Sequence, residues 1–106
     1  MESQELITEI SNRLVQAYKP LEIYLCGPSN WNSADDGDLE LIVVVDSSNE
    51  PHRVKRSLVG NQALFGLMVG TFVFVYTKPE FDSFAQDYDT LAHLAKTRGQ
   101  KIYANA

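Results

Sequence analysis

The sequence predicts a single α/β (α+β) domain, residues 1–106, in which helices flank a small mixed sheet. Segments with helical periodicity alternate along the chain with apolar, β-branched runs, which indicates layers of helix and strand. The run 39–45 is almost wholly apolar and is typical of a central strand covered on both faces. A length of 106 residues is common for one domain, and no repeat or linker divides it.

The composition narrows the class of protein. Apolar residues make up 44% of the chain and charged residues 22%, as in ordinary globular proteins, and no run approaches the roughly 18 apolar residues of a membrane span. The start of the chain lacks the basic and apolar segments of a signal peptide, and Cys26 is the only cysteine, so we expect a cytoplasmic protein without disulfides. A net charge of −5 opposes non-specific binding to nucleic acid.

The first half of the chain reads as helix, strand, polar loop and strand. Residues 4–18 have apolar side chains at helical spacing, and Pro20 ends this helix because proline disfavours helix at the preceding residue. Residues 21–26 alternate as in a strand, which Gly27 closes. Residues 28–37 are polar and turn-forming, and they lead into the apolar strand 39–45.

A second helix is predicted to follow the turn 46–51, with Asn49 as its N-cap and Pro51 tolerated near its start. Its expected apolar side carries Val54, Leu58, Val59 and Ala63. Arg53, Lys55 and Arg56 form the only basic cluster of the chain. Such clusters are commonly solvated helix faces, and a minority of them bind phosphate.

The last third reads as strand, break, helix and short edge strand. Residues 67–77 are rich in valine and aromatic side chains and predict a strand. A helix is expected over 89–98, with Asp87 or Asp89 as its N-cap and Gly99 at its end. Its inward positions are expected to be Leu91, Leu94 and Ala95. Residues 101–104 complete the sheet as an edge strand.

Two carboxylates open the strand 39–45. Asp38 and Glu40 are two residues apart, so they point to the same face, roughly 6–7 Å apart at the backbone. One interpretation is the solvated end of a strand. The other is a site for a divalent cation, because carboxylate oxygens favour Mg²⁺ or Mn²⁺ and neighbouring carboxylates repel each other without a cation.

The order of motifs resembles the minimal nucleotidyltransferases of the polymerase-β-like superfamily over nearly the whole chain. Gly27 and Ser29 match the Gly-Ser turn after the first strand, and Asp38-Leu39-Glu40-Leu41 matches the acidic opening of the second. Thr77-Lys78-Pro79-Glu80-Phe81 matches a later turn. The tail of the family is matched by Leu91, Ala95, Gly99, Ile102 and Tyr103.

This resemblance implies Mg²⁺- or Mn²⁺-dependent transfer of AMP, or another nucleoside monophosphate, from a nucleoside triphosphate to a protein or hydroxyl acceptor. Asp38 and Glu40 would hold the metal, and Gly27 and Ser29 would contact the phosphates. Of the three residues in the basic cluster, Arg53 or Lys55 would pair with phosphate.

The chain also departs from the family pattern. Pro28 stands in the Gly-Ser turn, and the third catalytic carboxylate aligns with Phe72, or with Thr71 or Val73 in a shifted register. Candidate replacements for that carboxylate are Asp35, Asp36 and Asp46. The resemblance therefore allows weak or lost activity. The alternative function is an inactive binding module, such as the antitoxin partner of a small, basic, helical ribonuclease toxin, or a homodimer formed through the strand edge near Ile102.

Overall fold

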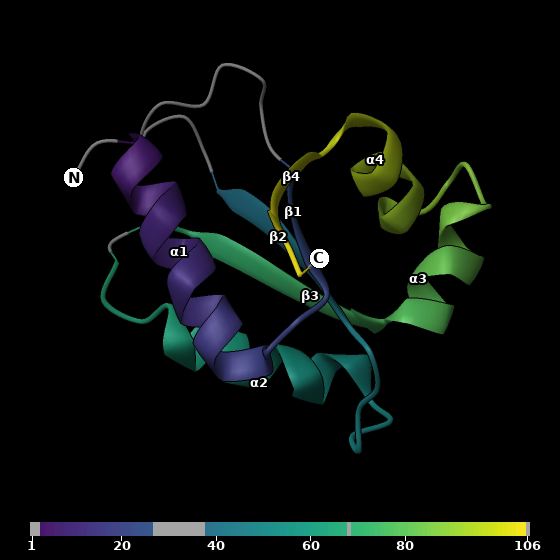
Figure 1. Cartoon of the computed structure of the whole chain (residues 1–106), viewed down its shortest axis with the longest axis horizontal. Coiled ribbons are helices and arrows are strands. Elements are labelled where there is room, and N and C mark those ends of the chain that lie inside the picture. The colour runs from purple at the N-terminus through teal and green to yellow at the C-terminus, as the bar shows by residue number, and fades with distance from the viewer. Residues whose placement is uncertain (1–2, 27–37, 68, 106) are drawn as a thin grey trace.

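The computed structural model describes residues 3–26, 38–67 and 69–105 (Figure 1). Its elements, in chain order, are α1 (Ser3–Tyr18), β1 (Glu22–Cys26), β2 (Leu39–Val45), α2 (Arg53–Ala63), β3 (Thr71–Thr77), α3 (Lys78–Ala85), α4 (Leu91–Arg98) and β4 (Gln100–Ala104). The four strands form one mixed sheet in the order β3-β2-β1-β4. The predicted α/β (α+β) fold class is therefore confirmed.

The sheet lies between two layers of helices. Strand β1 is antiparallel to β2 and to β4, whereas β2 and β3 are parallel and are connected through α2. Figure 1 shows α1 and α2 on one face and α3 and α4 on the other. Strand β2 is central and buried along nearly its whole length, as the apolar run 39–45 predicted.

Each face of the sheet has its own hydrophobic cluster. Alternation along the strands sends odd-numbered residues of β2 toward α1 and α2 and even-numbered residues toward α3 and α4. The first cluster is Leu6, Ile10, Leu14, Ile23, Leu39, Leu41, Val43, Val45, Leu64, Val73 and Val75. The second is Tyr24, Cys26, Ile42, Val44, Tyr76, Phe81, Ala85, Ala92 and Ala95.

Helix α2 is rotated relative to the sequence prediction. Val54, Leu58 and Val59, which were expected to face inward, are 78%, 55% and 48% exposed. The buried positions are Arg56 and Gly60 instead. The prediction was wrong because it chose the buried side of the helix from hydrophobicity alone. The buried side is determined instead by Arg56, which has several hydrogen-bond partners, and by Gly60, where α1 and α2 approach closely.

The close approach at Gly60 also connects α2 to α1. The Tyr18 hydroxyl donates to the Arg56 carbonyl at 2.5 Å and accepts from the Gly60 N–H at 2.7 Å. A Cβ atom at position 60 would lie 2.8 Å from Val73 Cγ1 and 2.9 Å from that hydroxyl oxygen. Only glycine fits here without displacing its neighbours. Burial raises the pKa of Tyr18, against the smaller opposite effect of the Gly60 hydrogen bond.

The helix caps differ from those predicted. The N-cap of α2 is His52 rather than Asn49, and its side chain makes no capping hydrogen bond. The N-cap of α4 is Thr90, whose hydroxyl accepts from the His93 N–H, rather than Asp87 or Asp89. Both predictions placed the helix start too early in the chain, because non-helical residues separate Asn49, Asp87 and Asp89 from the first helical turn.

The C-terminal elements otherwise follow the sequence closely. Strand β3 begins at Thr71, four residues later than predicted. Where the sequence predicted a break, helix α3 begins directly after β3, through a capping box between Thr77 and Glu80. In α4 the buried residues are Ala92 and Ala95, while Leu94, expected inside, is 41% exposed. Among the described residues, no helix combines the length and hydrophobicity that a membrane crossing requires.

Candidate functional site

Asp38 and Glu40 lie at one end of the central strand, on the face of the sheet that α3 and α4 cover. Asp38 immediately precedes β2 and is exposed, and Glu40 is half-buried within the strand. Glu40 pairs with Cys26 on β1 and with Phe72 on β3. No ion pair joins either carboxylate to another described residue. The two carboxylates therefore concentrate negative charge at this end of β2.

The position of Asp38 depends on a glycine of the neighbouring segment. Leu39 donates its N–H to the Gly70 carbonyl at 2.9 Å, which brings the backbone before β3 alongside Asp38. A Cβ atom at position 70 would overlap Asp38 Oδ1 and would lie 2.6 Å from Asp38 Cγ. The absence of a side chain at Gly70 leaves the space that the carboxylate occupies.

The immediate surroundings of Glu40 are a thiol and an aromatic ring. Burial raises the pKa of the Cys26 thiol, and the charge of Glu40 raises it further. Cys26 is thus a buried core residue, and its thiolate, the reactive form, is disfavoured. Within the part of the chain that the structure describes, no group of three or more His, Cys, Asp or Glu side chains is placed to hold a metal.

Among the described residues, none of the other candidate acids places a third carboxylate beside Asp38 and Glu40. Asp46 follows the opposite end of β2, roughly 25 Å from Asp38 given the rise of a strand. Asp35 and Asp36 lie outside the described residues, as do the predicted phosphate-binding residues Gly27 and Ser29.

The basic candidates lie far from the carboxylates. The Arg53 guanidinium is 5.3 Å from the ring centroid of Tyr76, near the end of β3, and 4.6 Å from that of Phe84. Six residues of extended chain separate Tyr76 from Gly70, which corresponds to about 20 Å. Lys55 is exposed and lies 3.9 Å from Glu50. The structure therefore does not bring Arg53 or Lys55 together with Asp38 and Glu40.

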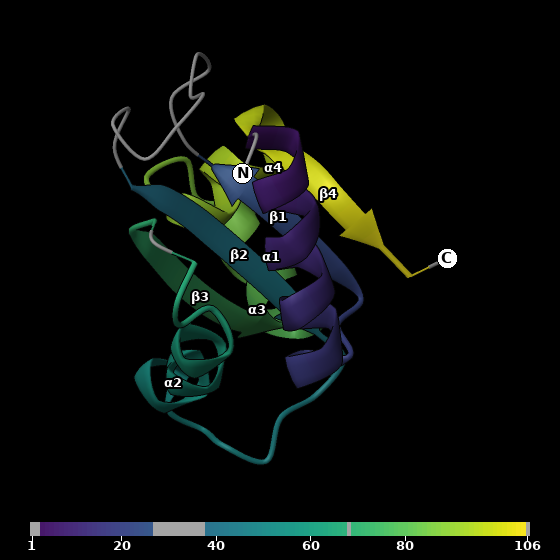
Figure 2. The same cartoon turned by 90° about the vertical axis from the view of Figure 1, so that its left-hand side faces the viewer.

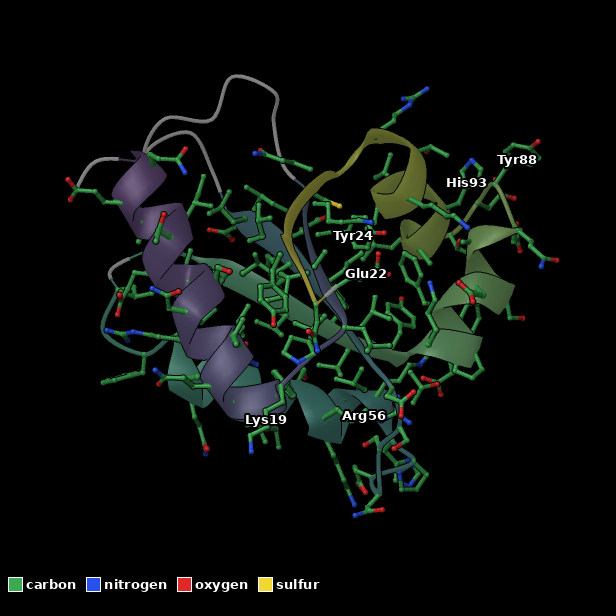
Figure 3. The ribbon with its side chains drawn as sticks, viewed as in Figure 1. Lys19, Glu22, Tyr24, Arg56, Tyr88 and His93 are labelled. Carbon is green, nitrogen blue, oxygen red and sulfur yellow. The ribbon has the colours of Figure 1, made fainter. Side chains whose placement is uncertain are left out.

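Arg56, the third member of the basic cluster, is 7% exposed and connects three elements (Figure 3). Its Nε donates to the Glu50 carbonyl at 2.6 Å, and Nη1 donates to Glu80 Oε1 at 2.6 Å and to the Val75 carbonyl at 3.4 Å. The hydrogen bond from Arg56 holds the pKa of Glu80 below its usual range despite partial burial. In the sequence no local signal distinguishes Arg56 from its exposed neighbours Arg53 and Lys55.

A second charged cluster surrounds Glu22 on β1 (Figure 3). Its carboxylate lies 2.8 Å from Lys101 Nζ on β4 and 3.4 Å from Lys78 Nζ on α3, and it accepts from the Tyr24 hydroxyl at 3.1 Å. Burial raises the pKa of Glu22, but the hydrogen bonds from Lys101 and Tyr24 and the charge of Lys78 outweigh it, so this pKa is lowered. Partners on several elements satisfy the carboxylate, which indicates a structural role.

The structure also reveals exposed aromatic side chains that the sequence did not single out as functional. Phe72 and Phe74 on β3 are 52% and 36% exposed, and Phe65 after α2 is 86% exposed. Between α2 and β3 lies a hollow of about 570 Å³. The valine and aromatic content of residues 67–77 predicts a strand, but it does not show that this strand lies at the edge of the sheet.

Comparisons with known proteins give no assignment, since no family model, curated protein or solved structure matches this chain.

Proposed function

We propose that this chain is a nucleotidyltransferase-like protein that binds a metal-bound nucleoside triphosphate through Asp38 and Glu40 and transfers its nucleoside monophosphate slowly or not at all. The observation that supports this proposal is the pairing of Glu40 with Phe72. The resemblance aligns the third carboxylate with Phe72, or with Thr71 or Val73 in a shifted register, and none of these side chains is a carboxylate that could bind a metal or act as a general base.

The two carboxylates suit one divalent cation. Oxygen ligands on one face, one exposed and one half-buried, fit Mg²⁺ or Mn²⁺ whose remaining ligands are triphosphate oxygens and water. When bound, the metal supplies charge stabilisation to the transferring phosphoryl group. A missing general base costs about 10²–10⁴-fold in rate. We therefore expect the protein to bind ATP or a related triphosphate, to require Asp38 for this binding, and to transfer AMP only weakly.

Titration calorimetry of each nucleoside triphosphate with Mg²⁺ or Mn²⁺ tests the binding. We expect heat of binding with the wild type and none with Asp38→Asn. Phe72→Asp adds the third carboxylate beside Glu40 and should increase metal affinity and AMP transfer. Phe74→Asp is the matched control, because it places the same charge on the same strand face one residue pair further from Glu40. Absence of any binding to the wild type rejects the proposal.

A second candidate function is an inactive binding module, and the exposed apolar surface of α2 and β3 favours it. Val54, Leu58, Phe65 and Phe72 are each more than half exposed, and large apolar side chains exposed on neighbouring elements are a common feature of protein interfaces. The net charge of −5 suits a basic partner such as a small helical ribonuclease.

Inhibition of a candidate ribonuclease from the host tests this second function. The wild type should inhibit the enzyme, Phe65→Lys should not, and Leu94→Lys should behave like the wild type because Leu94 lies on α4, across the sheet. Equal inhibition by all three proteins would show that this surface is not the one used.

A further inference from the structure

Strand β3 lies at the edge of the sheet, and its outward backbone groups are only partly occupied. Because Gly70 directs its carbonyl to β2 and successive residues of a strand alternate, Thr71, Val73 and Val75 direct their N–H and C=O groups away from the sheet. Arg56 donates to the Val75 carbonyl, and Glu80 accepts from the N–H of Thr77, the next outward residue. The segment 71–75 has no neighbouring strand among the described residues.

The two edges of the sheet differ in how they are protected. Strand β4 has five residues, a register irregularity against β1, and Lys101 on it, all of which discourage pairing with another strand. Strand β3 has seven residues, and from Thr71 to Thr77 it contains neither a charge nor a proline. Its exposed side chains, Phe72 and Phe74, are aromatic. An open, apolar edge of this length favours pairing with a further strand.

Helix α2 lies near this edge of the sheet (Figure 2). The hollow of about 570 Å³ is bounded on one side by residues 71–76 and on the other by Arg53, Val54, Ser57 and Asn61 of α2. A strand added to β3 would therefore have the backbone of β3 beside it and the exposed side of α2 along one of its faces.

We propose that the strand that pairs with β3 is β3 of a second copy of this chain, antiparallel, with Val73 of each copy opposite the other. A two-fold axis at Val73 places Thr71 opposite Val75 of the second copy, so the outward backbone groups of both strands face each other. The same axis places Phe72 of each copy opposite Phe74 of the other, which gives two aromatic cross-strand pairs. The two sheets then become one continuous sheet.

The charges at the ends of the edge select this partner and this orientation. Asp38 lies beside Gly70 at one end, and Arg53 lies against Tyr76 at the other. In the proposed register Tyr76 faces Gly70 of the second copy, so Arg53 of each copy approaches Asp38 of the other. Arg53 belongs to α2, but its guanidinium reaches the rings of Tyr76 and Phe84, which lie on the side of the sheet that α3 and α4 cover. The Asp38 carboxylate lies against Gly70, which has no side chain to separate the two charges. A parallel copy would place like charges together at both ends.

The exposed side of α2 extends the interface on the opposite face. The helix runs antiparallel to β3, with Arg53 near Tyr76 and Asn61 near Thr71. Leu58, 55% exposed, lies midway along the helix, so the two-fold axis at Val73 brings it near its copy. The dimer therefore buries apolar groups on both faces of the joined sheet. This inference does not depend on nucleotide binding or on another protein.

Sedimentation equilibrium of the purified full chain, without nucleotide, tests the proposal. We expect a dimer for the wild type and a monomer for Phe72→Lys, because a charged side chain on an edge strand opposes pairing. Leu94→Lys is the matched control, since it replaces another partly exposed apolar side chain on α4 and should leave the dimer intact. Circular dichroism establishes that each variant is folded.

A charge exchange tests the register. Arg53→Glu and Asp38→Lys should each weaken the dimer at least about tenfold, and the two changes combined should restore it. A wild type that stays monomeric at about 100 μM overturns the proposal. A dimer that withstands Phe72→Lys, or one that the combined charge exchange does not restore, overturns it as well. Leu58→Lys should also weaken the dimer, and it lies on α2 away from Asp38 and Glu40, so nucleotide binding measured on this variant separates the fate of the dimer from that of the proposed function.

Discussion

Replacing Arg56 with methionine should destabilise the fold more than any other change in the basic cluster. Methionine retains the apolar stem but removes every hydrogen bond of the guanidinium. Glu80 loses its charged partner, and the carbonyls of Glu50 and Val75 lose their donor. The change thus affects the connection between α2, β3 and α3 without creating a large cavity.

The magnitude follows from the burial of the two partners. Removing one member of a buried ion pair costs about 3–5 kcal/mol. The Arg56 side chain is 6% exposed and the Glu80 side chain 33%, so Glu80 is rehydrated when it is left alone. We therefore expect the lower end, about 3 kcal/mol, which for a domain of this size lowers Tm by roughly 10 °C or more.

Urea unfolding at pH 7, followed by circular dichroism, measures this loss. Lys55→Met is the matched control on the same helix, because exposed ion pairs contribute about 1 kcal/mol or less. A loss below about 1 kcal/mol for Arg56→Met would refute the reasoning, since it would mean that the guanidinium is not a buried partner of Glu80.

The same pair gives a pH dependence. Because the hydrogen bond from Arg56 lowers the pKa of Glu80 in the folded state, the contribution of Glu80 to stability is present above pH 4.5, the ordinary value. It is lost as the pH falls through the lowered pKa. The difference in unfolding free energy between the wild type and Glu80→Gln should therefore shrink in acid, whereas a constant difference would contradict the pairing.

Three further predictions concern other parts of the molecule. Glu22→Gln should remove an acid-sensitive contribution that is present above pH 4.5 and lost as the pH falls through the lowered pKa of Glu22, measured by urea unfolding from pH 3 to pH 7. Gly60→Ala should destabilise by at least about 1 kcal/mol in the same assay, because overlap with Val73 outweighs the better helix propensity of alanine. Gly70→Ala should leave stability nearly unchanged but should displace the Asp38 carboxylate and weaken any Mn²⁺ binding measured by calorimetry; unchanged Mn²⁺ affinity would contradict this.

The sequence predicted those parts of the fold that local patterns determine. The helix over residues 4–18 and the central strand 39–45 follow from periodicity and a continuous apolar run, and both are confirmed. The predicted orientation of α2 was wrong because the orientation depends on contacts with residues that are distant in the sequence. Tyr18 hydrogen-bonds to the backbone of α2, and Glu80 pairs with the Arg56 side chain.

The candidate site was predictable to the same extent. Alternation along a strand predicted that Asp38 and Glu40 share a face, and the register adds Phe72 as a neighbour of Glu40. The expectation that Arg53 or Lys55 reaches the same site remains unsupported, because the tertiary path of α2 separates them from it. The order of strands across the sheet, which makes β3 an edge, depends on long-range pairing and has no local signature.

The Tyr18 hydroxyl has a consequence for how the protein opens. It hydrogen-bonds to a carbonyl and to an amide that lie one turn apart in α2, so the C-terminal end of α1 is tied to the backbone of another helix. Local opening of that turn must release the phenol, and fraying of α1 must leave the turn without a partner. The two helices should therefore exchange their amide hydrogens as one cooperative unit, with Gly60 reporting on both.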